Sequence, residues 1–429
     1  MRAIVVGSGA GGATAARELV RQGMEVVVLE AGSEMKPFTR RVGWTEPIRR
    51  AGLLGSDKQV SRFIPAYRTA RGGEDLTLVR SVAVGGCTVV SCGNMVRAEK
   101  GLKELGLDLT GEFEELERCV GVAAVPRERW RPLTSRMFDA AREMGWDPQA
   151  TPKAVDVGRC TSCGLCEVGC PTGARWDSRR FLDEAVRSGC SVRPGVAVDK
   201  VMMDGGRAVG VRAVAGGRAE TIRADVVVLA AGGIGTAQVL RASGIDPSDT
   251  LWADLVLTVG GASEGARQLE EPPMAWFAPR DGYIVSPYLD VLSHWFHRPW
   301  RDVGLRDRVG VMVKLAEEAN GRVLADGSVQ KPLSGADRER LRSAGDEVRA
   351  MMERSGVSGP FVDGLLHGGH LGGTVPLRKE DVDGMHPSIL PDSLYVADLS
   401  LLPRSQGLPT MLVAAALAMR VSRRIIEPK

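Results

Sequence analysis

The segment Met1-Arg-Ala-Ile-Val-Val-Gly7-Ser-Gly9-Ala-Gly-Gly12 opens the chain, and a second apolar run, Met24-Glu-Val-Val-Val-Leu-Glu30, follows an alanine-rich stretch. This order predicts a strand, a glycine turn, a helix and a second strand with an acidic end, which is the dinucleotide-binding unit of a Rossmann-type sheet. Gly7 permits the tight turn, Gly9 lets a pyrophosphate approach the backbone, and Gly12 lets the helix pack closely on the strand. Glu30 is expected to accept hydrogen bonds from the adenosine ribose and to repel a 2′-phosphate. The unit by itself does not distinguish FAD from NAD.

Later segments of the chain are expected to add strands and a helix to the sheet of this dinucleotide-binding unit. Residues 224–233 predict a buried parallel strand with a glycine turn, and residues 393–403 predict a buried strand with Asp398 at its end. A helix is expected to follow at residues 410–426 and to pack on the sheet. Meander strands are predicted at residues 192–201, 208–214 and 218–223. A helical pattern with one buried face covers residues 102–144.

The length of 429 residues exceeds what one compact core accommodates, so two interleaved structural units are expected. We predict an α/β fold, in which a Rossmann-type dinucleotide-binding domain with a parallel sheet and a β-meander is interleaved with an α+β antiparallel-sheet substrate domain. The expected boundaries are 1–100, 185–250 and 388–429 for the first domain, 101–184 for a helical segment, and 251–387 for the second domain.

The composition is that of an ordinary globular enzyme. Hydrophobic residues make up 44% and charged residues 25% of the chain, and the net charge of +3 gives no sign of nucleic-acid binding. No stretch reaches the eighteen or so apolar residues that a membrane helix needs. The first apolar run leads directly into the glycine loop and leaves no room for a signal peptide, so a cytoplasmic location is expected.

Four of the eight cysteines stand together in Cys160-Thr-Ser-Cys163-Gly-Leu-Cys166-Glu-Val-Gly-Cys170-Pro. Spacings of two, two and three residues followed by proline are typical of the bacterial ferredoxin motif, whose thiolates hold a 4Fe-4S cluster. We therefore predict that Cys160, Cys163, Cys166 and Cys170 bind such a cluster.

Other interpretations of these cysteines remain open. A structural zinc normally joins two cysteine pairs separated by a dozen or more residues, and disulfides in such short loops would be strained. In ferredoxins with two clusters the fourth cysteine of the motif serves the other cluster. In that case Cys170 would be replaced by one of four more distant residues: Cys87, Cys92, Cys119 or Cys190.

Together these pieces resemble the glucose-methanol-choline (GMC) oxidoreductases, a family that binds FAD and oxidises alcohols. The resemblance covers essentially the whole chain, in the order of the first glycine turn, the Gly85-Gly86 stretch, the 226–233 strand, His370-Leu-Gly-Gly-Thr374 and the Asp398 strand. It is closest to the branch of long-chain alcohol oxidases and cholesterol oxidases. In the former, a cysteine-containing segment similar to Gly-Cys170-Pro-Thr-Gly-Ala174-Arg occurs at the same place.

The resemblance implies non-covalently bound FAD and assigns His370 as the residue that deprotonates or orients the substrate hydroxyl, a role that suits neutral imidazole. Val198 would contact adenine through its backbone, Asp398 would hold the ribityl or pyrophosphate region, and Ser91 and Cys92 would line the flavin. The resemblance implies cofactor contacts for Gly7, Ser8, Gly9, Ala10, Gly12, Glu30, Ala31, Gly85, Gly86, Ser91, Cys92, Val198, Ala231, Asp398, Leu399, Pro409 and Thr410.

The chain departs from the family at one important position. The second active-site residue, usually Asn or His, falls on Leu408 or Pro409, and neither side chain can hydrogen-bond a hydroxyl. The usual asparagine beside the flavin falls on Ser91. No histidine lies in that stretch, which argues against a covalent flavin link.

We expect an FAD- and 4Fe-4S-dependent dehydrogenase that moves hydride from an alcohol to flavin and single electrons through the cluster to a carrier protein. Two alternatives remain: a reductase of a carbonyl or activated double bond that is fed by the cluster, and an electron-transfer subunit without substrate turnover. An oxygen-using oxidase ranks below these. The substrate is expected to be apolar, although the sequence does not identify it, the direction of electron flow or the oligomeric state.

Overall fold

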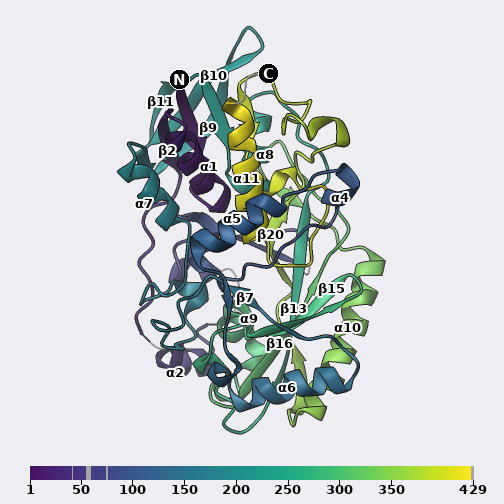
Figure 1. Cartoon of the computed structure of the whole chain (residues 1–429). Coiled ribbons are helices and arrows are strands. Elements are labelled where there is room, and N and C mark those ends of the chain that lie inside the picture. The colour runs from purple at the N-terminus through teal and green to yellow at the C-terminus, as the bar shows by residue number, and fades with distance from the viewer. Residues whose placement is uncertain (41, 55–58, 74–75, 427–429) are drawn as a thin grey trace.

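The computed structural model describes residues 1–40, 42–54, 59–73 and 76–426 of the chain. Residues 41, 55–58, 74–75 and 427–429 of the expected first domain therefore lie outside the described residues. Two sheets dominate the molecule, a parallel one in the upper half of Figure 1 and a larger mixed one in the lower half.

The parallel sheet has the strand order β21-β12-β1-β2-β8. Its strands are β1 (Arg2–Val6), β2 (Glu25–Glu30), β8 (Ser191–Pro194), β12 (Val226–Leu229) and β21 (Leu394–Val396). The central strands are almost continuously apolar because they are covered on both sides. Helices α1 (Ala10–Arg21) and α11 (Met411–Ile426) pack together beside the sheet, and the meander packs against its strands. The predicted Rossmann-type sheet with its β-meander is confirmed.

The meander consists of β9 (Val196–Asp204), β10 (Arg207–Ala215) and β11 (Arg218–Arg223). The stretch 192–201, which the sequence predicted as one strand, is divided between two sheets. Gly195 has a φ of 71°, a left-handed conformation that ends β8 in the parallel sheet and starts β9 in the meander.

The mixed sheet has nine strands, in the order β3-β4-β20-β13-β16-β15-β14-β6, with β19 also paired to β13. All its neighbouring pairs are antiparallel except β4 and β20. The strands are β3 (Tyr67–Arg71), β4 (Thr77–Ser81), β6 (Gln149–Ala150), β13 (Trp252–Ala262), β14 (Trp276–Arg280), β15 (Tyr283–Pro287), β16 (Arg308–Leu315), β19 (Ser358–Asp363) and β20 (His367–Gly372). Helices α6 (Pro132–Glu143) and α10 (Gly335–Arg354) pack along it. Ser334 caps α10 by accepting a hydrogen bond from the Asp337 amide.

The region 102–144 is not one continuous helix. It forms α4 (Leu102–Leu105), α5 (Thr110–Val120) and α6, because Gly106 and Gly121 adopt left-handed conformations at the ends of the first two. The remaining helices are α2 (Glu46–Arg50), α3 (Val60–Phe63), α7 (Arg179–Arg187), α8 (Gly232–Ala242) and α9 (Val291–Phe296). Short strands are β5 (Ala123–Ala124), β7 (Pro152–Lys153), β17 (Arg322–Val323) and β18 (Val329–Gln330). None of the helices in the described ranges is long and apolar enough to cross a membrane.

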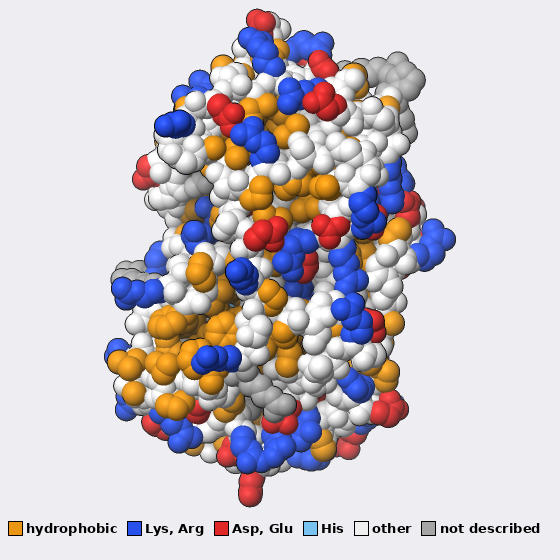
Figure 2. Space-filling view, turned by 90° about the vertical axis from the view of Figure 1, so that its left-hand side faces the viewer, with side chains coloured by type: hydrophobic (Ala, Val, Ile, Leu, Met, Phe, Trp, Pro, Cys, Tyr) orange, Lys and Arg blue, Asp and Glu red, His pale blue; other side chains and the backbone are white. Residues whose placement is uncertain are grey.

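The face in Figure 2 carries hydrophobic side chains gathered in its lower half, with basic side chains among them. Trp44, Leu53 and Phe63, from the segment around α2 and α3, are exposed large hydrophobic residues. Beneath the surface, this segment shares a hydrophobic cluster with Leu165 and Val168 of the cysteine-rich loop. The segment around α2 and α3 therefore packs directly against the cysteine-rich loop.

Candidate active site

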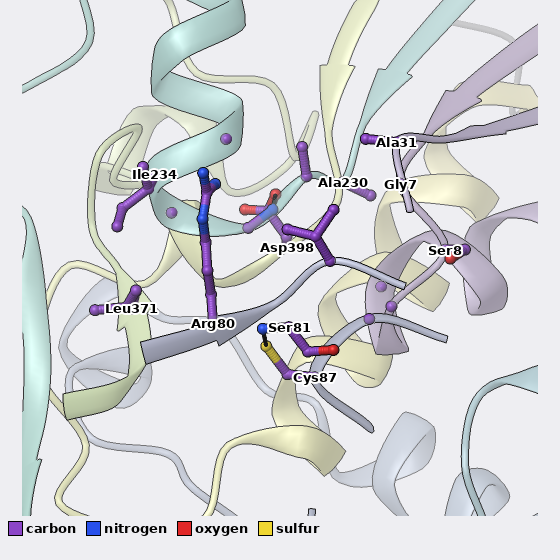
Figure 3. A pocket seen from close by; sticks show the side chains of 18 of the residues that line it. Gly7, Ser8, Ala31, Arg80, Ser81, Cys87, Ala230, Ile234, Leu371 and Asp398 are labelled. Carbon is purple, nitrogen blue, oxygen red and sulfur yellow. Dashed lines mark hydrogen bonds between the residues drawn. The ribbon is translucent and has the colours of Figure 1, made fainter. Parts of the chain in front are cut away.

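A cavity of about 640 Å³ lies at the carboxyl ends of the parallel strands, which is where ligands bind in open α/β sheets. Most of the residues expected to contact a dinucleotide line it: Gly7, Ser8, Gly9, Ala10, Glu30, Ala31, Gly86, Ser91, Val198, Ala231, Asp398, Leu399 and Thr410. Figure 3 shows part of this lining. Cys92 and Pro409 instead line a neighbouring smaller cavity, and Gly12 and Gly85 lie outside the lining of both.

Close backbone contacts explain the glycines of the two loops. A Cβ atom on Gly12 would lie 2.1 Å from the carbonyl oxygen of Gly7, and one on Gly86 would lie 2.8 Å from the Cα of Gly9. Helix α1 thus packs directly on the turn before it, and the second glycine stretch packs directly on the first. Gly12 and Gly86 therefore have to be glycine, because any side chain would overlap the neighbouring backbone.

Glu30 and Ser8 join the two glycine loops. The Ser8 hydroxyl donates to Glu30 Oε2 at 2.6 Å and accepts from the Gly85 amide at 2.9 Å, while Glu30 Oε1 accepts from the Gly32 amide at 2.8 Å. Burial raises the pKa of Glu30. The carboxylate therefore organises the end of β2 as well as facing the cavity.

Asp398 is held in a similar way. Its Oδ2 accepts from the Gly232 amide at 2.8 Å and the Thr236 hydroxyl at 2.6 Å, and its Oδ1 accepts from the Ser400 amide at 2.8 Å. Burial raises its pKa. Asp398 thus fixes the start of α8 against the turn after β21, at the edge of the cavity.

Arg80 is a cavity residue that the sequence did not indicate. Figure 3 shows its side chain extending from β4 into the cavity toward Ile234 and Asp398. Within the described part of the chain its guanidinium makes no hydrogen bond or ion pair, and burial lowers its pKa. An unpaired cation at this place is suited to an anionic ligand.

A second cavity, of about 160 Å³, adjoins the first, and the two share eight lining residues that include His370. Its polar lining includes Tyr67, Asn94, Glu167, Asp254, Tyr288, Lys314, His367 and His370, and apolar residues such as Val256, Met274 and Met312 also line it. His370 therefore stands at the boundary between a cavity of cofactor size and a smaller one.

Asp254 and Lys314 hold His370 in place. Asp254 lies directly opposite His370 on the adjacent strands β13 and β20, and Lys314 belongs to β16 on the other side of β13. His370 Nδ1 is 3.0 Å from Asp254 Oδ2 and 2.5 Å from Lys314 Nζ. Burial, and next the charge of Lys314, lower the pKa of His370. The imidazole is thereby kept neutral near neutral pH.

Asp254 also organises the turn that carries Leu408 and Pro409. Its Oδ1 accepts from the Ser405 hydroxyl at 2.7 Å and from the amides of Gln406 and Gly407 at 2.9 and 2.8 Å. Burial alone would raise its pKa, but the hydrogen bond to His370 and the charge of Lys314 bring a net lowering. One buried carboxylate therefore positions both the histidine and the closing turn.

The four clustered cysteines line one small cavity of about 20 Å³, together with Cys92 and Arg175. Ser162, Gly164 and Gly169 take left-handed conformations, which coil the loop around this cavity. All four thiols are free, and burial raises the pKa of Cys166 to about 12. In the described ranges, no three His, Cys, Asp or Glu side chains converge on a point where one metal ion would sit.

The cysteine loop contacts the second glycine stretch and lines the smaller of the two cavities. Arg175 donates to the Val89 carbonyl at 2.9 Å and the Ser91 hydroxyl at 3.1 Å, so it ties the end of the loop to the second glycine stretch. Glu167 lies between Cys166 and Cys170, accepts from the Val291 amide at 3.0 Å and from the Tyr288 hydroxyl, and lines the smaller cavity. The loop is therefore a wall of the site.

Comparison with known proteins relates the whole arrangement to one family. Residues 1–260 match the family model of GMC oxidoreductases. An uncharacterised GMC-type oxidoreductase of Mycobacterium tuberculosis is 34% identical over 273 residues, which are 59% of this chain and 41% of that protein. The chain thus spans about two fifths of the length of this relative.

Two further proteins are similar over nearly the entire chain. An uncharacterised protein of Methanocaldococcus jannaschii is 25% identical, and the match covers 98% of this chain and 99% of that one. The crystal structure of pyridoxine 4-oxidase from Mesorbium loti superposes with a TM-score of 0.73 over 100% of this chain and 99% of its own. Its 14% sequence identity makes this a likeness of fold.

Proposed function

The chain belongs to the GMC oxidoreductase family, and from that premise we propose that it is an FAD-dependent oxidoreductase acting on the CH–OH group of a small molecule. The observation that carries the proposal is the placement of His370, which is held by Asp254 and Lys314 where the two cavities meet. FAD, when bound, supplies a hydride acceptor for the carbinol carbon. His370 accepts the hydroxyl proton, and Asp254 orients the ring.

The larger cavity fits the proposed cofactor. The amides at the start of α1 and the unpaired Arg80 offer positive charge for a pyrophosphate, and Glu30 offers carboxylate oxygens for a ribose. Ser91 and Thr410 line the part of this cavity that adjoins the smaller one, as His370 does, and the flavin ring would lie there. We propose the cofactor contacts given by the family resemblance for the residues that line the cavity, with Cys92 and Pro409 on the substrate side.

The smaller cavity supports a compact substrate. Its volume of about 160 Å³ is close to the roughly 150 Å³ of a cavity that binds benzene. A long-chain alcohol, such as the named family branch oxidises, exceeds this space. We therefore propose a small alcohol with a partly apolar body, placed against residues such as Val256 and Met312.

An anaerobic substrate screen tests this function. The protein is loaded with FAD, and bleaching of the flavin absorbance is followed with benzyl alcohol, other small primary alcohols and decanol. We expect the small alcohols to bleach the flavin in the wild type and none to do so in His370→Ala. The proposal is wrong if no alcohol bleaches the flavin and FAD does not bind.

We also propose that the cysteine loop holds a 4Fe-4S cluster that passes single electrons to a carrier protein. What supports this is the common cavity lined by Cys160, Cys163, Cys166 and Cys170. A cubane takes its four cysteine thiolates around itself, so they need not converge on one metal ion. Arg175 and Lys153 are buried cations that favour the thiolate of Cys166, and they would offset the charge of the ligands.

Metal content tests the cluster directly. After anaerobic reconstitution we expect about four irons and four sulfides per chain, on the cubane expectation. Cys160→Ser should lose iron, whereas Cys119→Ser, an exposed cysteine on α5, should keep it. Fewer than about three irons in the wild type would contradict the cluster and leave the alcohol chemistry standing.

A further inference from the structure

Lys314 is a buried lysine whose ammonium group faces the catalytic imidazole. All eight residues of β16 are buried, and the Lys314 side chain is 5% exposed. Its Nζ lies 2.5 Å from His370 Nδ1, 3.4 Å from His370 Nε2 and 3.7 Å from Asp254 Oδ2. A cationic donor and an anionic acceptor thus face the same ring nitrogen.

Nδ1 of a neutral imidazole is either a hydrogen-bond donor or an acceptor, so it cannot accept from Lys314 and donate to Asp254 at the same time. If Nδ1 accepts from the Lys314 ammonium, it has a lone pair, and the proton of the neutral imidazole is on Nε2. If Nδ1 donates to Asp254 Oδ2, it carries the proton, and Nε2 has the lone pair. The charge on Lys314 discriminates between the two, because an uncharged amine no longer competes as a cationic donor.

We propose that Lys314 is the positioning residue that sets which nitrogen of His370 carries the proton, and thereby sets the direction of proton transfer. This inference rests on the proposed alcohol chemistry. With Lys314 charged, the Nε2 proton is available to a carbonyl oxygen, as reduction requires. With Lys314 uncharged, the Nε2 lone pair accepts the proton of an alcohol, as oxidation requires. Between the states Lys314 releases one proton to solvent, while the imidazole stays neutral and its own proton moves from Nε2 to Nδ1.

The surroundings of Lys314 lower its pKa, so that its loss of charge falls within the pH range in which proteins are studied. Burial lowers the pKa of Lys314 to about 8, against the opposing influence of Asp254 and then Cys92. The lysine is thus charged below about pH 8 and uncharged above it. The other titratable groups that line the same cavity are Tyr67, Arg80, Cys87, Cys92, Glu167, Asp254, Tyr288, His367 and His370.

Nitrogen NMR of the FAD-loaded protein, labelled with ¹⁵N at its histidine rings, tests the inference without any turnover. The His370 signals are assigned by their loss in His370→Gln. In the wild type we expect the ring proton to move from Nε2 to Nδ1 as the pH rises through about 8. In Lys314→Met it should be on Nδ1 throughout, and in Lys314→Arg, a permanent cation, it should stay on Nε2. Lys200→Met, at an exposed position of the meander, should behave as the wild type.

Kinetics provide the second readout. At pH 6.5 we expect Lys314→Met to lose carbonyl reduction by about a hundredfold relative to alcohol oxidation, within the usual range for removing a proton donor. A wild-type His370 tautomer that stays unchanged across pH 6.5–9.5, or a ring proton on Nδ1 in Lys314→Arg, overturns the inference, even if Lys314→Met does not fold. A tautomer change without flavin bleaching by any alcohol instead leaves this inference standing and contradicts the proposed function.

Discussion

Asp254 and Lys314 show how much of the site depends on single charged residues inside apolar strands. The sequence analysis predicted His370 but neither of these two, since β13 and β16 are, apart from Thr258 and Arg308, apolar runs that a sheet core explains. A signal was nevertheless present. Burying a charge is costly unless it is paired, so an aspartate and a lysine within two such strands indicate partners, although the sequence does not say which.

Asp254→Asn should impair proton transfer while leaving the cofactor bound. The new amide would donate to His370 Nδ1 and hold the ring proton on Nε2, where a base needs a lone pair. We expect alcohol-dependent flavin reduction to slow by about a hundredfold, measured by anaerobic stopped-flow absorbance, with unchanged FAD content. Asp246→Asn, whose side chain is 91% exposed, is the matched control and should be neutral. Equal rates in the two variants would contradict the role assigned to Asp254.

Glu30→Gln tests the dinucleotide end of the large cavity. Both carboxylate oxygens accept from the protein, so an amide nitrogen in place of one oxygen would face an N–H donor. We expect FAD to bind about tenfold more weakly, which corresponds to loss of about 1.4 kcal/mol from a hydrogen bond to a charged group. Titration of the apoprotein by flavin fluorescence measures this. Glu25→Gln, at the exposed start of the same strand, should leave the affinity unchanged, and a similar loss there would show only a general charge effect.

At the scale of elements, the sequence predicted many of the helices and strands, but not the side-chain hydrogen bonds that join them. The strand, glycine turn, helix and strand of residues 2–30 were predicted, as was the C-terminal helix, because each has a local signal. Ser178 lies just before α7, but its hydroxyl donates to the carbonyls of Ser8 and Gly85 and does not cap the helix. Such contacts join residues far apart in sequence, and no local pattern encodes them.

The cysteine motif is also a short sequence pattern whose residues contact parts of the chain far away in sequence. Its spacing predicted that the four cysteines bind a 4Fe-4S cluster, which stays a prediction, and the four thiols line one small cavity. The motif gave no indication that Arg175 would tie the loop to the second glycine stretch or that Glu167 would line the smaller cavity. These contacts join the loop to the second glycine stretch and to the smaller cavity.

Arg175→Met should loosen the cysteine loop from the second glycine stretch. The buried guanidinium donates to the carbonyls of Thr88, Val89 and Trp176, and methionine would leave these without that donor. We expect the free energy of unfolding to fall by about 3 kcal/mol, measured by urea titration, together with weaker retention of FAD. Arg180→Met removes an exposed arginine from the same region and should change stability by less than about 0.5 kcal/mol. A loss as small as this for Arg175→Met would mean that the loop is anchored elsewhere.

For the whole molecule, the decisive feature is the seam where the two sheets meet. Strand β20 carries His370 in the mixed sheet, and its last residue, Gly372, touches the turn after β21 of the parallel sheet. A Cβ atom on Gly372 would lie 2.3 Å from the Leu399 carbonyl oxygen and 2.4 Å from the Trp252 ring. The position of His370 relative to the large cavity therefore depends on a contact without space for a methyl group.

Gly372→Ala should separate the two sheets at this seam. The contacts to a backbone carbonyl and a buried indole cannot relax by a simple side-chain rotation, so we expect a loss of about 2 kcal/mol or more, typical of overpacking. Gly111→Ala makes the same chemical change in α5 with no atom within 4 Å, and should stabilise the protein by about 0.5–1 kcal/mol through helix propensity. Thermal unfolding of the FAD-loaded variants measures both, and opposite shifts of the melting temperature are expected. The contact at Gly372 also positions His370, so Gly372→Ala should slow flavin reduction at temperatures where the variant remains folded. A stable Gly372→Ala variant with an unchanged rate would show that other contacts position the two sheets.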